Sequence, residues 1–392
     1  MREDPARARV LPYLSAWLRE RLGSPGLGPG AVVSRLATVL HADLSGFTQL
    51  TARFTSGPAD AERLHIALNQ CYSVLIDTVT AYGGDVAAIA GDALTAWWPQ
   101  LAHAEHARRC ALALHAAMLS LPALETPAGP FRFYLRIGIG VGMVHATLAG
   151  MPGHGVHLVL AGPALAAVAA AEQAAPGESI ICSIQTAPGA AQECDHPGDG
   201  GQPLRAEHFL PRGLSARLRR GEPLTAYRRC VPVFARFDLP AQPAALHPLV
   251  REVQQVVQRW GGWLNEIEVG DKGAVLVLLF GATVVRSDDA SRAVGCSLAL
   301  RERGLIERAG ITLGLLYLGT VGGSQRRVYT AQGDEMNLAA HLMQRAAPGE
   351  ILVSGRVRHE VLQRYPTSEP TLMVTKGHPE GVPVARVLGS QV

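Results

Sequence analysis

The feature that most constrains the fold of this chain is an internal repeat. The segment AAPGESIICS at 174–183 returns as AAPGEILVSG at 346–355, 172 residues later. Two glycines return at the same offset, since Gly142 and Gly150 match Gly314 and Gly322. Self-similarity at this spacing predicts two copies of one structural unit within the chain.

The repeat divides the chain into four expected parts. The two copies fall at 31–190 and 226–392, and 1–30 reads as an N-terminal helical segment. Its leucines at 11, 14, 18 and 22 follow helical spacing. Residues 191–225 are rich in glycine and proline and are expected to form a linker or an excursion from the first unit.

Each copy has the same order of periodic segments. Apolar runs and helical periodicity alternate as β-α-β-β-α-β with additions, which is typical of a ferredoxin-like α+β sheet, and we expect the helices on one face of that sheet. The expected elements of the first copy are a strand at 36–42, a helix at 64–82, a hairpin at 86–90 and 93–98, a helix at 104–119, strands at 133–142 and 156–162, a helix at 164–175 and a strand at 179–182.

Composition excludes several classes of protein. The 392 residues are 48% hydrophobic and carry a formal net charge of +3, too small to favour nucleic acid or an anionic membrane as a partner. No apolar run is long enough to span a bilayer, and the N-terminal stretch lacks a signal-peptide pattern, so a cytoplasmic protein is expected. The six cysteines form no CxxC pair, which favours free thiols over a zinc site.

Two acidic residues stand where a site could form. Asp43 ends the first apolar strand, and Asp92 lies at the tip of the hairpin. In a ferredoxin-like sheet these strands are neighbours, so both carboxylates are expected to converge on one cation. Such oxygen ligands suit Mg²⁺, which commonly uses one or two carboxylates plus substrate phosphates. The LSGFT turn after Asp43 opens a helix, and its backbone N–H groups are placed to bind phosphate.

Three segments carry a resemblance to the class III nucleotidyl cyclases. ADLSGFTQLTARF, GGDVAAIAGDALTAWW and LRIGIGVGMVHATLAG match the family's motifs in order and spacing. The tandem arrangement is most similar to soluble adenylyl cyclase and its bacterial relatives, and the resemblance covers about 31–390. It implies that the two copies pair head to tail as an intramolecular pseudo-two-fold dimer. One active site would then lie between them.

The resemblance also implies roles for individual residues. The implied cofactors are two Mg²⁺ or Mn²⁺ ions, and the implied partner is a nucleoside triphosphate. The metal ligands would be Asp43, Asp92 and the Leu44 carbonyl. The phosphate contacts would be Ser45, Gly46, Phe47, Thr48, Arg136 and Lys376, the base contacts Glu266 and Thr330, and the catalytic residues Asn337 and His341.

Some positions depart from the family pattern. His341 stands where the family has a transition-state arginine, and a histidine lacks the bidentate fork of arginine. Glu266 stands where adenylyl enzymes read adenine with lysine; a carboxylate suits guanine, whereas Thr330 suits adenine, so base choice stays open. Ala88 and Ala169 replace the residues that bind bicarbonate in soluble adenylyl cyclase, which argues against that route of activation. The mirror site is expected to be inactive, with Arg236 at the first metal position, Leu165 at the asparagine position and Ala169 at the arginine position.

Two functions of different classes follow. The first is cyclisation of ATP or GTP to a 3′,5′-cyclic nucleotide and pyrophosphate. The second is a degenerate regulatory or nucleotide-binding module with little turnover, in which His341 packs on its helix and Glu266 is a solvated hairpin residue. On plainer interpretations, Asp43 and Asn337 cap helices and Arg136 is a strand-edge cation. Relatives often continue into further domains, so a longer parent protein is also expected.

Overall fold

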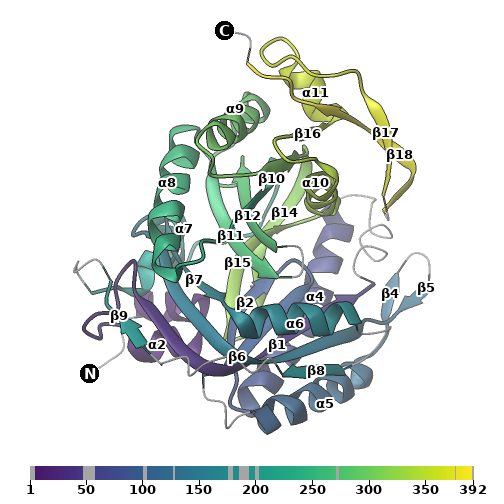
Figure 1. Ribbon diagram of the computed structural model, residues 1–392. Helices are drawn as coiled ribbons and strands as arrows, with labels where there is room; N and C mark the ends of the chain where they lie inside the picture. The colour runs from purple at the N-terminus through teal and green to yellow at the C-terminus, as the bar shows by residue number, and fades with distance from the viewer. Residues whose placement is uncertain are drawn as a thin grey trace.

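Two β-sheets organise the chain in the computed structural model (Figure 1). The structure describes residues 5–46, 58–99, 104–126, 129–174, 180–184, 194–198, 203–270, 273–375 and 377–390.

The first sheet has the strand order β2-β3-β1-β6-β7. β8 pairs parallel with β6. β9 pairs antiparallel with the first residues of β1, Val32 to Ser34. The strands are β1 (Val32–Ser45), β2 (Asp85–Ala90), β3 (Ala93–Trp98), β6 (Tyr134–Met151), β7 (Gly155–Ala161), β8 (Ile180–Ile184) and β9 (Cys194–His196), and a separate ribbon joins β4 (Leu124–Thr126) to β5 (Gly129–Phe131).

The second sheet repeats this topology. β10 lies between the β11–β12 hairpin and β13, as β1 lies between the β2–β3 hairpin and β6, and β16 runs parallel to β13 as β8 does to β6. The strands are β10 (Ala226–Phe237), β11 (Trp263–Gly270), β12 (Gly273–Phe280), β13 (Arg308–Ile311), β14 (Gly314–Gly322), β15 (Arg327–Gln332), β16 (Ile351–Ser354), β17 (Thr371–Thr375) and β18 (His378–Arg386). The expected α+β class is confirmed.

The helices cover both faces of each sheet, so the expectation of a single helical face is wrong. Ile137 and Ile139 of β6 pack with α4 (Pro58–Ala81) and α5 (Ala104–Ser120). Gly138 and Gly140 alternate with them and face α6 (Pro163–Ala174), where a Cβ on Gly140 would lie 2.4 Å from the Ala164 carbonyl oxygen. The alternation of the strand therefore sends large residues to one layer and glycine to the other. In the second unit, α8 (Leu246–Arg259) and α9 (Asp289–Glu302) lie opposite α10 (Asp334–Arg345).

The two units exchange equivalent contacts. Asn69 of α4 donates through Nδ2 to the Thr320 carbonyl and accepts the Gly322 N–H at 3.0 Å through Oδ1. Gln254 of α8 mirrors this by accepting the Met151 N–H at 2.8 Å and donating to the Gly155 carbonyl at 2.7 Å. The first helix of each unit thus docks on the long hairpin of the other unit.

The N-terminal segment packs against both units. It is broken into α1 (Pro5–Val10), a 3₁₀ turn at Leu11–Tyr13 and α2 (Ala16–Arg21), rather than forming one helix. Pro12 is the second residue of the 3₁₀ turn, and Ser15 caps α2 by accepting the Leu18 N–H. Tyr13, Leu14 and Leu18 are buried in a core that also contains Leu318 and Tyr329 of the second unit.

The segment between the units is also packed. β9 adds to the first sheet, and α7 (Arg212–Arg220) contributes buried Leu214 and Leu218 to the same core. The chain ends in α11 (Gly355–Val361) and the β17–β18 ribbon, which projects from the second unit in Figure 1.

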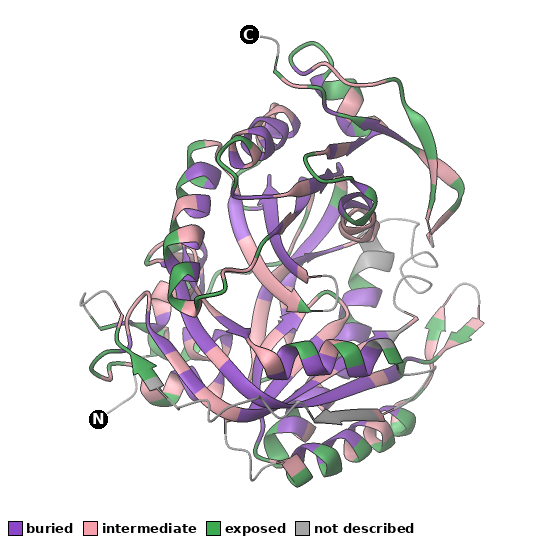
Figure 2. Cartoon of the chain, viewed as in Figure 1, coloured by how far each residue is buried: buried purple, intermediate pink, exposed green. Residues whose placement is uncertain are grey.

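Buried residues are concentrated on the strands of the two sheets, which are largely purple in Figure 2. Cys71, Cys110, Cys230 and Cys296 are free and buried, as expected for free thiols. Across the described residues, none of the helices combines the length and apolar character needed to cross a membrane.

Candidate active site

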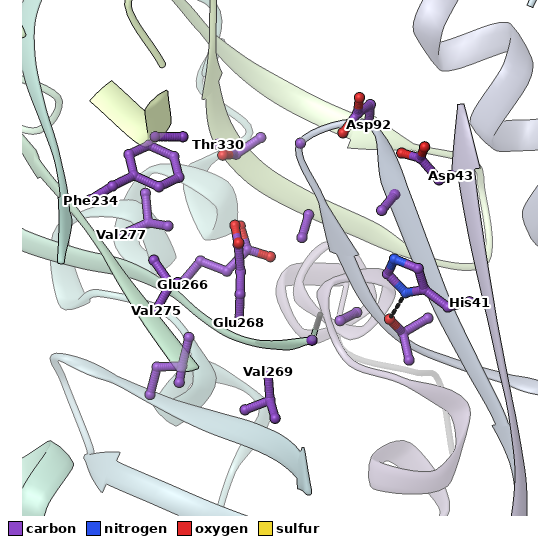
Figure 3. Close-up of a pocket in the computed structure, with 18 of the residues that line it drawn as sticks. His41, Asp43, Asp92, Phe234, Glu266, Glu268, Val269, Val275, Val277 and Thr330 are labelled. Carbon is purple, nitrogen blue, oxygen red and sulfur yellow. Dashed lines mark hydrogen bonds between the residues drawn. The ribbon is translucent and has the colours of Figure 1, made fainter. Parts of the chain in front are cut away.

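A cavity of about 320 Å³ lies between the two units, on the α6 side of β1. Figure 3 shows acidic side chains around it from β1, the β2–β3 turn and β11. The first unit contributes residues of β1, the β2–β3 hairpin, β6, β7 and α6, and the second contributes residues of β10, β11, β12, β15 and α10. Six of the residues predicted from sequence line it, namely Asp43, Asp92, Arg136, Glu266, Thr330 and Asn337.

Asp43 and Asp92 lie next to each other at one end of the cavity. Asp43 pairs with Ala93 across the β1–β3 ladder, and the Leu44 N–H donates to the Asp92 carbonyl at 2.9 Å. The sheet register therefore brings the two aspartates to adjacent strand ends, as the sequence predicted. Two carboxylates fit Mg²⁺ when phosphate oxygens and water complete its coordination. Among the described residues, no group of three or more histidine, cysteine or acidic side chains forms a closed metal site.

Arg136 bridges Asp43 to a second carboxylate. Its Nη2 donates to Asp43 Oδ2 at 3.0 Å and to Glu172 Oε1 at 3.1 Å. Glu172 belongs to α6, its side chain is 9% exposed, and its other oxygen lies 3.7 Å from His41 Nε2. The arginine predicted to bind phosphate is thus held between two acids.

The opposite end of the cavity is formed by β11 and β15. Asn265 Nδ2 donates to Thr330 Oγ1 at 3.0 Å, and the buried Asn265 Oδ1 has no hydrogen-bond partner among the described residues. Glu266 and Glu268 both line the cavity, and their carboxylates lie together in Figure 3. Burial, together with the neighbouring charge of Glu268, raises the pKa of Glu266 well above its usual 4.5.

α10 contributes Asn337 but not His341. Asn337 lines the cavity, and its buried Nδ2 lacks a hydrogen-bond partner within the described part of the chain. His341 follows one turn later and is partly buried, but the cavity lining from α10 consists of Met336, Asn337, Ala340, Met343 and Gln344.

The predicted phosphate turn is described only in part. Leu44 pairs with Leu135 in the β1–β6 ladder, and Gly46 has a positive φ of 97°, where its absent Cβ would lie 2.8 Å from Phe131 Cζ. Ser45 ends β1. Phe47, Thr48 and Lys376 lie outside the described residues.

The equivalent position in the second unit carries different chemistry. In the first sheet, Asp43 lies opposite Ala93 on β3 and Arg136 on β6. In the second sheet, Arg236 holds the equivalent register position, opposite Val275 on β12 and Arg308 on β13. Arg236 binds Glu307 at 3.1 Å. The cavity surface on this side is largely apolar and includes Ala88, Leu158, Leu165, Phe234, Val275 and Val277.

Sequence reasoning missed the acids that surround the predicted site. Glu172 is the single charged residue in the alanine-rich α6, and its burial could have been suspected from that isolation. Glu268 lies two residues after Glu266 on β11, so strand alternation places it on the same face. The sequence signal was present for both residues, but neither matched a motif.

Comparisons with known proteins agree with this architecture. No protein-family model matches the chain. Human adenylate cyclase type 10 is 23% identical over 385 residues, which covers 78% of this chain and 23% of that protein. Rat adenylate cyclase type 10 is 38% identical over 63 residues, covering 15% of this chain and 4% of that protein. The chain thus spans about a quarter of the human relative.

Among solved structures, a class III adenylyl cyclase-like ATP-binding protein from Pseudomonas aeruginosa matches with a TM-score of 0.59 and 13% identity. The match covers 84% of this chain and 85% of that one, and it shows a shared fold. The chain therefore has the α+β fold of the class III nucleotidyl cyclases. It is a distant homologue of adenylate cyclase type 10, as the three sequence motifs predicted.

Proposed function

We propose that the chain converts a purine nucleoside triphosphate to a 3′,5′-cyclic nucleotide and pyrophosphate at the cavity between its two units. The observation that carries this proposal is the composition of the cavity. Adjacent aspartates and an arginine come from one unit, and an asparagine, a threonine and a glutamate come from the other. The equivalent exchange of Asn69 and Gln254 contacts supports an intramolecular pseudo-two-fold dimer with one active site.

Asp43, Asp92 and the Leu44 carbonyl would hold two Mg²⁺ or Mn²⁺ ions. When bound, such ions lower the cost of forming the ribose 3′-oxyanion and offset charge on the phosphate oxygens. The aspartates supply the negative charge that binds these ions, and the low exposure of Asp43, 18% of its side chain, keeps water from screening it.

Asn337 and Thr330 would bind the nucleoside. Asn337 Nδ2, which has no partner among the residues that the structure describes, is a donor available to a ribose oxygen. Thr330 Oγ1 already accepts from Asn265, so its hydroxyl proton is free to donate to an acceptor on the base. Holding the ribose fixes the direction from which the 3′-oxygen approaches the α-phosphorus, and such positioning contributes much of the barrier reduction in phosphoryl transfer.

Arg136 would move from Asp43 to a phosphate when metal binds. Because Arg136 competes for Asp43, the variant Arg136→Ala is expected to tighten Mn²⁺ binding in the absence of nucleotide, by about 10-fold for one lost competing ion pair. Glu172→Gln removes the second carboxylate that binds Arg136. Arg136 should then bind Asp43 more tightly, so Mn²⁺ binding should weaken. Electron paramagnetic resonance of free Mn²⁺ measures both constants, and an unchanged constant in both variants would contradict the competition.

His341 does not line the cavity, so α10 would supply no cation to the transition state. The variant His341→Arg is expected to raise the turnover rate by about 10-fold, because arginine is longer and donates through a bidentate fork. Initial rates at saturating nucleotide test this, with Arg345→Lys in the last turn of the same helix as the control. An unchanged rate would mean that position 341 does not face the reacting phosphate.

The direct test is chemical. Purified protein is incubated with Mn²⁺ and either ATP or GTP, and cyclic nucleotide and pyrophosphate are measured by mass spectrometry. Equal amounts of the two products, absent from an Asp43→Asn/Asp92→Asn double variant, would support the proposal. Nucleotide binding without product would favour the binding-module alternative.

A further inference from the structure

Glu266 is placed where a nucleotide base would meet it, yet it is not held as an ordinary ionised carboxylate. The residue lies on β11 in the cavity wall, which Thr330 also lines, and it is half-buried. The structure gives its carboxyl group no hydrogen bond or ion pair among the described residues.

The charged and titratable neighbours of Glu266 come from several elements. Glu268 lies on the same strand, Arg326 precedes β15, Tyr72 lies on α4, and Asp43 and Asp92 lie across the cavity. Burial and the charge of Glu268 both disfavour a negative charge on Glu266.

Among the described residues, Arg326 is the cation that opposes this effect, but its donors are directed elsewhere. Its guanidinium donates to the carbonyl oxygens of Val86 at 3.1 Å, Ala87 at 3.1 Å and Tyr13 at 2.9 Å. These bonds tie the β15 end of the second unit to β2 and the N-terminal segment. Arg326 therefore acts on Glu266 through space and does not form a hydrogen bond that fixes the ionised form.

The two protonation states of a carboxyl group offer different hydrogen-bond patterns. An ionised carboxylate only accepts, which matches the N1–H and N2–H₂ donors of guanine. A protonated carboxyl group offers one donor and one acceptor, which matches the N1 acceptor and the N6–H₂ donor of adenine.

We propose that Glu266 reads adenine in its protonated form and guanine in its ionised form, so that the base preference of the site changes with pH. The proposal rests on the function proposed above, because it assigns a nucleotide base to this end of the cavity. Glu266 in its ionised form suits guanine, whereas Thr330 suits adenine. The proposal explains how both residues can serve one site, because the base preference depends on the protonation of Glu266. Below the Glu266 transition the site prefers ATP, and above it the site prefers GTP.

The test is equilibrium binding, which needs no turnover. Calorimetry with Mn²⁺ measures the affinities of ATP and GTP analogues that carry a methylene group between the α- and β-phosphorus. The ratio of the two affinities cancels pH effects on the phosphates and the aspartates. As pH rises across the range in which the protein stays folded, the ratio is expected to fall from favouring ATP to favouring GTP, by about 10-fold or more.

Two matched variants separate reading of the base from a structural role. Glu266→Gln keeps one donor and one acceptor at every pH, so it should prefer the ATP analogue throughout and lose the pH dependence. Glu268→Gln removes the neighbouring charge and should move the wild-type transition to lower pH.

Three results would overturn the inference. A wild-type ratio that stays constant across this range means that Glu266 does not read the base through its proton. A pH dependence retained in Glu266→Gln assigns the effect to another group. If neither analogue binds at any pH, the proposed function fails together with the inference, whereas the first two results leave the proposed function standing.

Discussion

Replacing Asp92 by asparagine is expected to lower the rate of cyclic nucleotide formation by about 10²- to 10³-fold. Asparagine keeps the size of the side chain but loses the charge that would hold a divalent ion. The backbone contact that positions this residue, from the Leu44 N–H to the residue 92 carbonyl, does not involve the side chain and should persist. Asp43→Asn should have a similar effect, with the added loss of the charge that binds Arg136.

The matched control is Asp77→Asn on the exposed face of α4, which should leave the rate unchanged. Rates are measured by product formation across a range of Mn²⁺ concentrations, and circular dichroism checks that each variant is folded. If Asp92→Asn retained wild-type activity at every Mn²⁺ concentration, the assignment of the metal end would be wrong.

Trp97→Ala is expected to reduce the free energy of unfolding by about 3–5 kcal/mol, the range for removing a large aromatic side chain from a core. Trp97 is fully buried and packs edge-on against Trp17 with ring centroids 5.5 Å apart. Its Nε1 donates to Asp85 at 3.2 Å, and the other Asp85 oxygen accepts the Ala16 N–H at 2.6 Å. The substitution therefore removes the packing between the N-terminal segment and the β2–β3 hairpin.

Trp97→Phe separates the two contributions. It keeps most of the apolar contact but loses the hydrogen bond to Asp85, so a smaller loss of about 1–2 kcal/mol is expected. Urea unfolding followed by fluorescence and circular dichroism measures both variants. A Trp97→Ala protein as stable as the wild type would contradict the packing of the N-terminal segment described here.

Much of the fold could be predicted because strand alternation and the repeat are local signals. The hairpin on either side of Gly91–Asp92 was predicted within a residue, since apolar runs end at a turn pair. The face covered by α6 could not be predicted from apolar periodicity, because Gly138 and Gly140 face the helix without any apolar side chain to mark that face. Leucine spacing predicted a helical N-terminal segment, and the break came at a 3₁₀ turn that contains Pro12 and separates α1 from α2.

The site was predictable where residues belong to contiguous motifs. Asp43 lies near the end of β1 and Asp92 lies in the β2–β3 turn, and strand order alone brings them together. Glu172 and Arg326 act through partners far away in sequence, such as Arg136 and Val86, so their roles depend on how helices and units pack. Whether His341 reaches the cavity depends on the rotation of α10, which sequence spacing does not determine.

The central claim is that one nucleotide binds across both units, and anomalous diffraction tests it most directly. Crystals grown with Mn²⁺ and an ATP analogue that cannot be cyclised would be measured at the manganese absorption edge. The account predicts manganese peaks beside the carboxylates of Asp43 and Asp92, with the base between Thr330 and Glu266. Manganese bound away from both aspartates, or a nucleotide that contacts one unit alone, would contradict it.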